Sequence, residues 1–328
     1  MPDRDVTRSV LRSPERTASL VFDLASLTKP RLAALVLCTL AGGMWLAPGS
    51  LPASSWMSTL LGTALLVGAA NALNCWIERD RDRLMPRTRN RPLPAGRISS
   101  DVGLAFGVLL TSVAVSVLAL GSNLLTFALG LLALVSYVAA YTPLKTRTSW
   151  ALLLGTIPGA LPPLMGWTAV TGRLDARGLV LFGLLVAWQI PHFLAIAMFR
   201  RNEYRAAGIQ VFPLVRGAGT TRAWMVAWAF VLLVLSLALV PLGLGGPVYA
   251  SVAAVLGVFF LGVVLHGAWM GGDRAWAWRV FRLSLVHLTA LFAALLLSSS
   301  SSHRAGRTEP GRPEGERSSI VSSAAGTR

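Results

Sequence analysis

The chain has 328 residues, of which 54% are hydrophobic and only 13% are charged. Soluble domains carry about 25% charged residues, so this composition argues against a soluble enzyme and points to lipid as the main solvent. The net charge of +16 comes from arginines in short clusters between apolar stretches. A nucleic-acid-binding protein would present a continuous basic face, so the expected partner is the lipid bilayer and no nucleic acid.

The first 28 residues mix arginines with acidic residues and precede the first apolar stretch. They contain no short apolar core followed by a cleavage site, so we predict a cytoplasmic N-terminal extension over 1–28 rather than a removable signal peptide. The two cysteines, Cys38 and Cys75, both fall in apolar segments, which argues against a disulfide framework.

Charge-free stretches mark the expected membrane spans, because a helix of about 20 apolar residues crosses the hydrocarbon core. Turn-forming residues divide the longer stretches near 48–52, 121–122 and 241–247. The sequence therefore predicts an all-α polytopic membrane protein with about nine transmembrane helices in a domain over 29–298. In chain order the stretches are 31–78 (two helices), 101–145 (two), 147–173, 177–200, 222–273 (two) and 282–303.

Positive charge is distributed unevenly between the predicted loops. The loops after the second, fourth, sixth and eighth helices carry most of the arginines, and the alternate loops carry very few. Because basic loops remain in the cytoplasm, we predict a multi-pass protein of the bacterial cell (cytoplasmic) membrane with a cytoplasmic N-terminus. The Ser-, Gly- and Arg-rich tail over 299–328 is expected to be disordered and to have little weight in the topology.

Three polar residues are spaced by four at the cytoplasmic end of the second predicted helix: Asn74, Glu78 and Asp82. That spacing puts them on one helical face, while Asp80 points to another side. Two such carboxylates can hold a hard divalent cation such as Mg²⁺, which prefers oxygen ligands and often bridges to phosphate. The alternative is a fraying helix end with solvated charges, but acids at membrane depth are costly and usually functional.

An arginine-rich loop follows directly, with the sequence RLMPRTRNRPLPAGR over 83–97. Arginines bind phosphate through two parallel hydrogen bonds and remain charged, and the Pro/Gly pattern predicts a tight loop around them. Carboxylates for Mg²⁺ beside arginines for phosphate indicate a diphosphate site. The chain has no Walker-type loop, so a lipid diphosphate is a more natural ligand than a nucleotide.

These residues resemble the first motif of the intramembrane aromatic prenyltransferase superfamily, which is an Asn, acids four and eight positions later, and then RTxxRPxxxG. Within the superfamily the chain is most similar to the haem-farnesylating branch, from about Leu27 to Leu297. The matching residues and stretches are Asn74, Glu78, Asp82, Arg87, Thr88, Arg91, Pro92, Gly96, LTKPR at 27–31, YTPLK at 141–145, IPGALPPLMGW at 157–167, WQIPHF at 188–193 and EYRAAGIQVFP at 203–213.

The resemblance implies a dry helical cavity in which Mg²⁺ assists ionisation of farnesyl diphosphate, and in which a vinyl group of haem b accepts the farnesyl group to give haem O. It further implies a downstream partner that uses the product, either a haem A synthase or an oxidase under assembly. The implied metal ligands are Glu78, Asp82 and Glu203, assisted by the catalytic Asn74. The implied substrate-binding residues are Arg87, Arg91, Lys145, Arg147, His192 and Tyr204.

Some of these assignments have equally simple alternatives. Lys145 and Arg147 could be ordinary positive-inside residues. His192 could contact the haem iron or a propionate, or could be a hydrogen-bonded packing histidine.

Two features bear on the acceptor. Quinone-forming relatives usually carry an acid where this chain has Cys75. They also carry two acids spaced by four in the second motif, where this chain has Glu203 and, four residues later, Ala207. The chain also departs from the haem branch, which usually has Asp at position 203 and Pro where this chain has Gln210. The alternatives are therefore a prenyltransferase acting on a quinone precursor such as 4-hydroxybenzoate, or, in a different class, a membrane transporter. A transporter is disfavoured because the acids lie at one surface rather than at the midplane.

Overall fold

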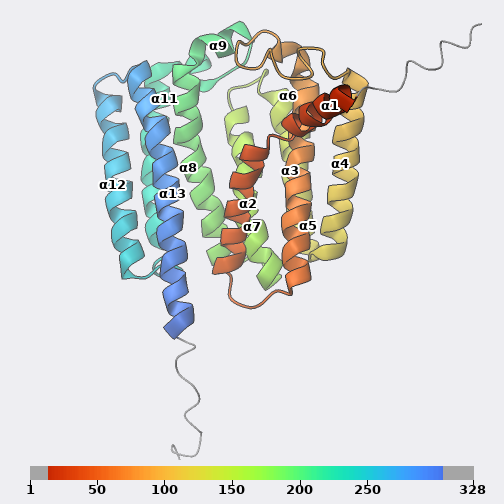
Figure 1. Ribbon diagram of the computed structural model, residues 1–328. Helices are drawn as coiled ribbons and strands as arrows, with labels where there is room; N and C mark the ends of the chain where they lie inside the picture. Colours follow the sequence, from red (N-terminus) through yellow and green to blue (C-terminus); the bar gives the residue numbers. More distant parts are fainter. Residues whose placement is uncertain (1–13, 306–328) are drawn as a thin grey trace, which may run out of the picture.

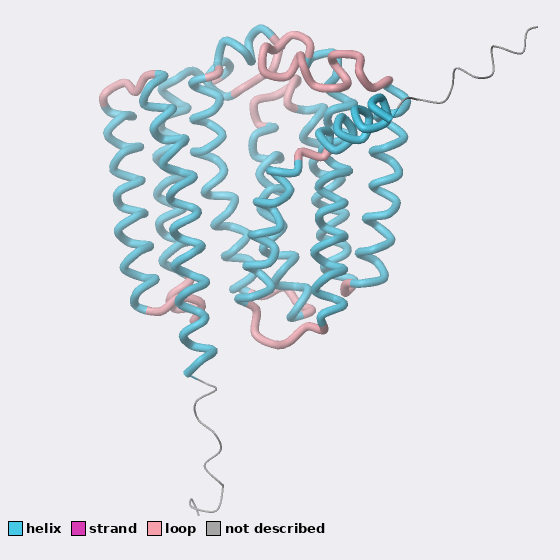
Figure 2. The backbone as a smooth tube through the Cα atoms, viewed as in Figure 1, coloured by secondary structure: helices cyan, strands magenta, loops and turns pink. Residues whose placement is uncertain are grey.

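The computed structural model describes residues 14–305, and every regular element in that range is helical. The long helices stand side by side in one bundle whose loops lie at two opposite ends (Figures 1 and 2). The elements are α1 (Pro14–Leu27), α2 (Pro30–Leu46), α3 (Ala53–Asp82), α4 (Ser100–Gly121), α5 (Leu124–Val135), the π-helix η1 (Ser136–Tyr141), α6 (Thr142–Leu144), α7 (Ala151–Thr171), α8 (Ala176–Phe199), α9 (Arg201–Ala206), α10 (Phe212–Val215), α11 (Gly217–Ala238), α12 (Pro247–Trp269) and α13 (Arg274–Ala305).

The number of spans is close to the prediction. Within residues 14–305, seven helices are long and apolar enough to cross a membrane, and the pair formed by α1 and α2, bent by 45°, brings the number to eight. Helix α7 is also 21 residues long, but it contains three prolines and is largely buried in the bundle. The all-α polytopic fold is confirmed, and α7, which corresponds to the predicted helix over 147–173, is an interior element of the bundle.

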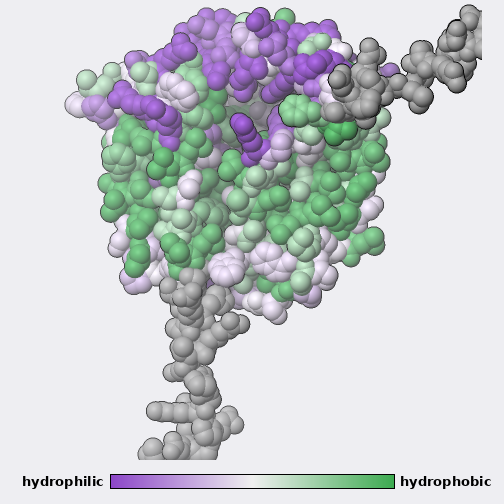
Figure 3. Space-filling model, viewed as in Figure 1, coloured by the Kyte–Doolittle hydropathy of each residue, from purple (hydrophilic) through white to green (hydrophobic). Residues whose placement is uncertain are grey.

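The two ends of the bundle differ in polarity. Figure 3 shows hydrophilic residues gathered at the end that carries α9 and the α3–α4 loop, above a broad belt of apolar side chains. Helix α1 lies at this same end, whereas α13 ends at the opposite one (Figure 1). The arginine-rich loops therefore share one end, as the positive-inside rule requires of loops on one side of a membrane. That this end faces the cytoplasm stays a prediction.

Side chains at the loops satisfy the free backbone groups where several helices begin. Asn123 accepts a hydrogen bond from the backbone of Thr126 at 2.9 Å, and Asp175 accepts from two N–H groups at the start of α8. Ser99 caps α4 through the backbone of Val102. Such caps typically contribute about 1 kcal/mol each, which explains why the spans start at these polar residues.

Glycines allow α2 and α7 to approach each other closely. A Cβ added at Gly43 would collide with the Pro163 backbone, and one added at Gly166 would collide with the carbonyl of Leu40. Small residues at helix contacts let backbones pack tightly in lipid, where no hydrophobic force draws helices together. This contact fixes the first span against the interior helix that carries part of the cavity wall.

The predicted boundary at 28/29 falls between α1 and α2, whereas the one at 298/299 falls inside α13. Helix α1 occupies the second half of the expected extension, and Asp23 binds Arg97 of the α3–α4 loop through two carboxylate oxygens at 3.0–3.2 Å. Helix α13 continues to Ala305, beyond the boundary expected at 298. Residues 1–13 and 306–328 lie outside the described range, so the disorder expected of the tail stays a prediction.

Candidate functional site

The acidic face of α3 lies in the protein interior. Asn74, Glu78 and Asp82 are 3%, 5% and 1% exposed, whereas the side chain of Asp80 is 69% exposed. The spacing by four therefore places three polar side chains on one buried face, and Asp80 points away to solvent-side arginines. Acidic side chains this deeply buried need partners, because an unpaired buried charge is costly.

The loop after α3 folds back over Asp82. Arg91 donates to the Asp82 carboxylate at 2.7 Å, and the Thr88 hydroxyl donates to the Asp82 carbonyl at 2.9 Å. Gly96 adopts a φ of 73°, a conformation that favours glycine, where the loop turns back toward α4. The RTxxRPxxxG pattern is therefore a compact loop that brings arginines to the end of the acidic face.

A π-helical turn supplies the facing wall. In η1 the backbone widens, and the Thr142 side chain donates to the Tyr137 carbonyl at 2.8 Å. Tyr137 and Tyr141 stack with ring centroids 5.6 Å apart, and Lys145, four residues further, forms an ion pair with Glu78. Single π-helical turns occur often at functional sites. This one aligns two tyrosines and a lysine toward α3.

Lys29 reaches the same site from the start of α2. It is the one non-glycine residue with positive φ (52°) in the described range, and its Nζ lies 3.4 Å from Asn74 Oδ1. The Asn74 amide in turn donates to Thr142 Oγ1 at 3.1 Å. The sequence analysis did not assign Lys29, although a lysine in a chain with only two lysines was a usable signal.

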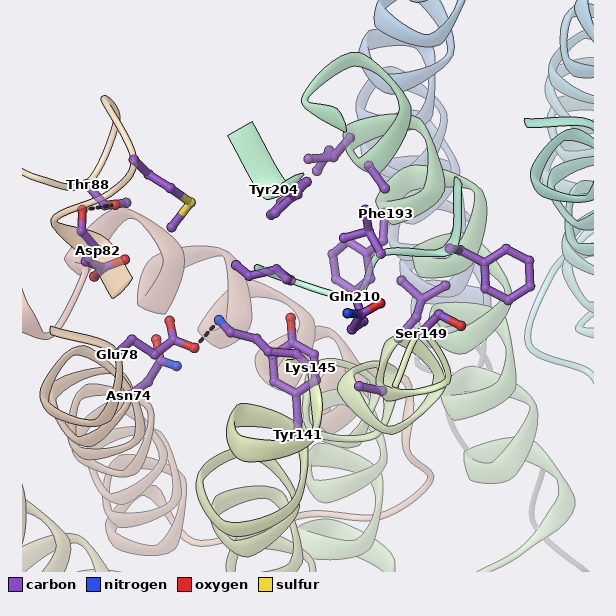
Figure 4. A pocket seen from close by; sticks show the side chains of 18 of the residues that line it. Asn74, Glu78, Asp82, Thr88, Tyr141, Lys145, Ser149, Phe193, Tyr204 and Gln210 are labelled. Carbon is purple, nitrogen blue, oxygen red and sulfur yellow. Dashed lines mark hydrogen bonds and ion pairs between the residues drawn. The ribbon is translucent and has the colours of Figure 1, made fainter. Parts of the chain in front are cut away.

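These elements enclose a cavity of about 290 Å³ at the polar end of the bundle. Figure 4 shows Asn74, Glu78 and Asp82 on one side of it and Phe193 and Tyr204 on the other. Its charged lining consists of four basic and two acidic side chains, which leaves an excess of positive charge suited to a polyanion. The charged lining residues are Lys29, Arg87, Arg91, Lys145, Glu78 and Asp82; the apolar and aromatic lining includes Tyr137, Tyr141, Leu152, Phe193, Leu194 and Phe212.

Tyr204 of α9 lies on the cavity wall, as the sequence analysis expected. A tyrosine hydroxyl is protonated at neutral pH, and burial raises the pKa of this one further, so the hydroxyl is available as a hydrogen-bond donor. Beside it, the backbone N–H of Gln210 donates to the Lys145 carbonyl at 3.1 Å. A proline at position 210, as in the haem branch, would lack this N–H, so the departure at Gln210 adds a backbone link to the loop that carries Lys145.

Three residues assigned from the sequence lie off the cavity wall. Glu203 is held by Arg200 through both carboxylate oxygens at 2.8 and 3.1 Å, because the two residues lie one turn apart. Arg147 is exposed beyond the turn that follows Lys145. His192 points toward α13, where its Nδ1 lies 2.7 Å from Ser284 Oγ. The structure therefore does not bring these three to the cavity lining.

The set of candidate metal ligands is smaller than the sequence predicted, because Glu203 lies off the cavity wall. Among the described residues, no three acidic, histidine or cysteine side chains gather into one cluster, so Glu203 does not join Glu78 and Asp82. Glu78 and Asp82 each pair with a base through one oxygen, Glu78 with Lys145 and Asp82 with Arg91. A carboxylate has two oxygens, so each retains one. With the Asn74 amide oxygen, this hard-oxygen donor set fits Mg²⁺.

Cys75 does not face the cavity. It is 1% exposed and packs with Leu27, Ala72, Leu93 and Ile98. The residue that replaces the acid of quinone-forming relatives therefore fills a hydrophobic contact under the α3–α4 loop. Any influence on the acceptor would be indirect.

Residues 35–286 match the UbiA prenyltransferase family. The chain belongs to this family. It is 54% identical over 283 residues to a protoheme IX farnesyltransferase from Myxococcus xanthus, covering 86% of this chain and 96% of that protein.

The UbiA family also accounts for the fold. The structure resembles a UbiA homologue from Aeropyrum pernix with a TM-score of 0.66 and 21% identity, covering 82% of this chain and 98% of that one. It also resembles a UbiA homologue from Archaeoglobus fulgidus bound to GPP and Mg²⁺, with a TM-score of 0.59 and 15% identity over 83% of this chain and 99% of that one. The chain is therefore a membrane-embedded prenyltransferase, and the transporter alternative is discarded.

Proposed function

We propose that this UbiA-family enzyme transfers a farnesyl group from farnesyl diphosphate to a vinyl group of haem b, giving haem O. The observation that carries the proposal is the buried acidic face of α3 opposed by basic side chains in one cavity, in a chain 54% identical to a protoheme IX farnesyltransferase. The product would be used by a haem A synthase or by oxidase assembly.

The diphosphate is assigned to the basic side of the cavity. Arg87, Arg91, Lys29 and Lys145 line it, and Arg91 and Lys145 are already held in place by Asp82 and Glu78. Positively charged side chains that are already oriented stabilise the negative charge that develops on a leaving group, because they need not reorganise during the reaction. These residues bind and orient the diphosphate as the bond to farnesyl C1 breaks.

Mg²⁺ bound by the Glu78 and Asp82 carboxylates, with Asn74, would neutralise charge on the diphosphate and so assist its departure. The protein holds those carboxylates 5% and 1% exposed, away from competing water. Since the Archaeoglobus fulgidus homologue is bound to GPP and Mg²⁺, a metal-dependent diphosphate site is in keeping with the family. Glu203 lies with Arg200 outside this set, so we omit it from the metal ligands.

The aromatic wall protects the allylic cation. Tyr137, Tyr141 and Phe193 present rings to the cavity, and excluding water there prevents the cation from being quenched before it meets the acceptor. The farnesyl C1 forms a bond to the terminal vinyl carbon of haem b, and the resulting cation on the neighbouring carbon takes up water and releases one proton. The product is a hydroxyethylfarnesyl haem with free diphosphate.

We assign the transmembrane domain to 29–298, the polar end with its N-terminal extension to the cytoplasm, and the protein to the bacterial cell membrane. The shared placement of α1 and the basic loops at one end of the bundle supports this orientation.

The proposal is tested in membranes that contain the protein, haem b, farnesyl diphosphate and Mg²⁺. Mass spectrometry of the extracted pigments should detect hydroxyethylfarnesyl haem in the presence of Mg²⁺ and none after chelation. A Glu78→Gln variant at equal membrane abundance serves as the inactive control. Unchanged haem b in the complete mixture would contradict the proposed function.

A further inference from the structure

A row of aromatic rings runs along the contact between α8 and α13, outside the cavity lining. The His192 ring stacks on Trp188 with centroids 4.7 Å apart and lies 4.9 Å from Phe281. Phe281 in turn contacts Phe199 at 5.6 Å and Trp278 at 5.1 Å. These five residues form a continuous aromatic row from the interior of the bundle to the polar end.

The hydrogen bonds around His192 determine its tautomer. Its Nδ1 lies 2.7 Å from Ser284 Oγ, and the same hydroxyl lies 2.7 Å from the Phe281 carbonyl. A hydroxyl has one proton and a carbonyl can only accept, so both contacts are hydrogen bonds only if His192 Nδ1–H donates to Ser284. The neutral imidazole therefore carries its free lone pair on Nε2.

The second ring nitrogen of His192, Nε2, is not used in packing contacts between polar groups of the described residues. No hydrogen bond to Nε2 is present within the described residues, and this atom is not fully enclosed by the protein. The Nε2 of His287, by contrast, is fully enclosed. A histidine whose Nδ1–H is anchored and whose Nε2 is unprotonated is the arrangement found at metal-ligating histidines, where the anchor orients the ring.

The row also connects the cavity with positive charge at the membrane surface. Phe193 lines the cavity and its ring lies 5.7 Å from that of His192. At the other end, the guanidinium of Arg282 lies 5.7 Å from the Trp278 ring and forms no ion pair within residues 14–305. The macrocycle of haem b is a flat apolar ring with two carboxylates, the propionates, at one edge. Its shape therefore matches an aromatic wall that ends at a basic side chain.

We propose that His192 Nε2 binds the iron of haem b, with the macrocycle against the α8–α13 aromatic row and its propionates toward Arg282. This inference rests on the proposed function, since it names how the acceptor is held. Ser284 is a positioning residue that fixes the imidazole tautomer. Phe193, whose ring lies 5.7 Å from that of His192, lines the cavity in which the farnesyl group is activated, so a haem bound at His192 lies next to that cavity.

The test is spectroscopic and needs no turnover. Ferric haem is titrated into the full-length protein in nanodiscs without farnesyl diphosphate, and the Soret band and electron paramagnetic resonance spectrum are recorded. The wild type should give the signature of imidazole-ligated iron. His192→Ala should lose it and bind haem about tenfold or more weakly, since one metal–ligand bond is removed. Free imidazole should restore the signature in His192→Ala.

Two controls separate ligation from folding. His287→Ala removes a buried histidine of α13 and should retain the wild-type spectrum. Ser284→Ala should keep the imidazole signature but weaken haem binding about tenfold, as expected for loss of a supporting hydrogen bond to a ligand. Binding of farnesyl diphosphate with Mg²⁺ to His192→Ala, measured by calorimetry, should match the wild type because the cavity is intact.

Arg282→Gln should weaken haem binding, whereas Arg279→Gln, an exposed arginine of the same helix outside the aromatic row, should not. A wild type without an imidazole signature, or a His192→Ala spectrum identical to the wild type, would overturn the inference. If the wild type nevertheless makes farnesylated haem, the proposed function stands and only the assignment of His192 fails. If it makes none, the proposed function itself is wrong.

Discussion

Two aspartates at the end of α3 differ in burial and offer a matched test of the acidic face. Asp82 is 1% exposed and pairs with Arg91 at 2.7 Å. The side chain of Asp80 is 69% exposed and lies 3.7–3.9 Å from Arg79 and Arg83. Asp82→Asn and Asp80→Asn remove the same charge two residues apart, so their difference reports the environment of the carboxylate.

The structure sets the expected magnitudes. Exposed ion pairs contribute about 0–1 kcal/mol, so Asp80→Asn should change the free energy of unfolding by less than about 0.5 kcal/mol and leave kcat/KM near the wild-type value. Asp82→Asn replaces a buried, charge-assisted hydrogen bond and should cost about 1–3 kcal/mol of stability. Because it also removes a proposed Mg²⁺ ligand, kcat/KM should fall about 10²–10³-fold, which corresponds to roughly 2.7–4 kcal/mol in the transition state.

The assay is diphosphate release by protein in nanodiscs at saturating Mg²⁺, with thermal unfolding recorded on the same samples. The reasoning is refuted if the two variants lose activity equally, or if Asp82→Asn retains full turnover while it remains folded.

Three other perturbations follow from the structure. Lys29→Met should raise the KM for farnesyl diphosphate about tenfold, because it removes a cation of the cavity wall that forms no ion pair among the described residues; an unchanged KM excludes that role. Gly43→Ala should lower the thermal midpoint by forcing α2 away from α7, while Gly262→Ala, which meets no atom within 4 Å, should not; equal midpoints would refute the packing argument. In a cysteine-free background, Arg89→Cys should react with an impermeant thiol reagent only from the cytoplasm and Leu174→Cys only from outside, and the reverse pattern would invert the orientation.

Local sequence patterns predicted the features that depend on local geometry. Charge-free stretches located the helices, and the spacing by four correctly put Asn74, Glu78 and Asp82 on one face. Long-range packing decided the rest. The rarity of lysine marked Lys29 as unusual, but no pattern indicated that α2 would bring it to Asn74, or that the chain would widen into a π-helix and direct Tyr137 inward.

Three assigned residues lie off the cavity wall, and their placement has a common cause. Glu203, Arg147 and His192 were assigned from their place in motifs, without knowledge of which neighbour each would meet. Arg200, one turn from Glu203, holds it locally, and α13 supplies the hydroxyl that holds His192. A motif specifies which residues lie near a site, and packing between distant segments determines which side chains enter it.

The identity of the acceptor is the central claim, and a competition experiment tests it most directly. Membranes with the protein receive equimolar haem b and 4-hydroxybenzoate, labelled farnesyl diphosphate and Mg²⁺, and the labelled products are separated and identified by mass spectrometry. The label is predicted to appear in hydroxyethylfarnesyl haem and not in a prenylated benzoate. Labelled prenyl-hydroxybenzoate with unchanged haem b would contradict the account, while leaving the UbiA fold and its diphosphate site in place.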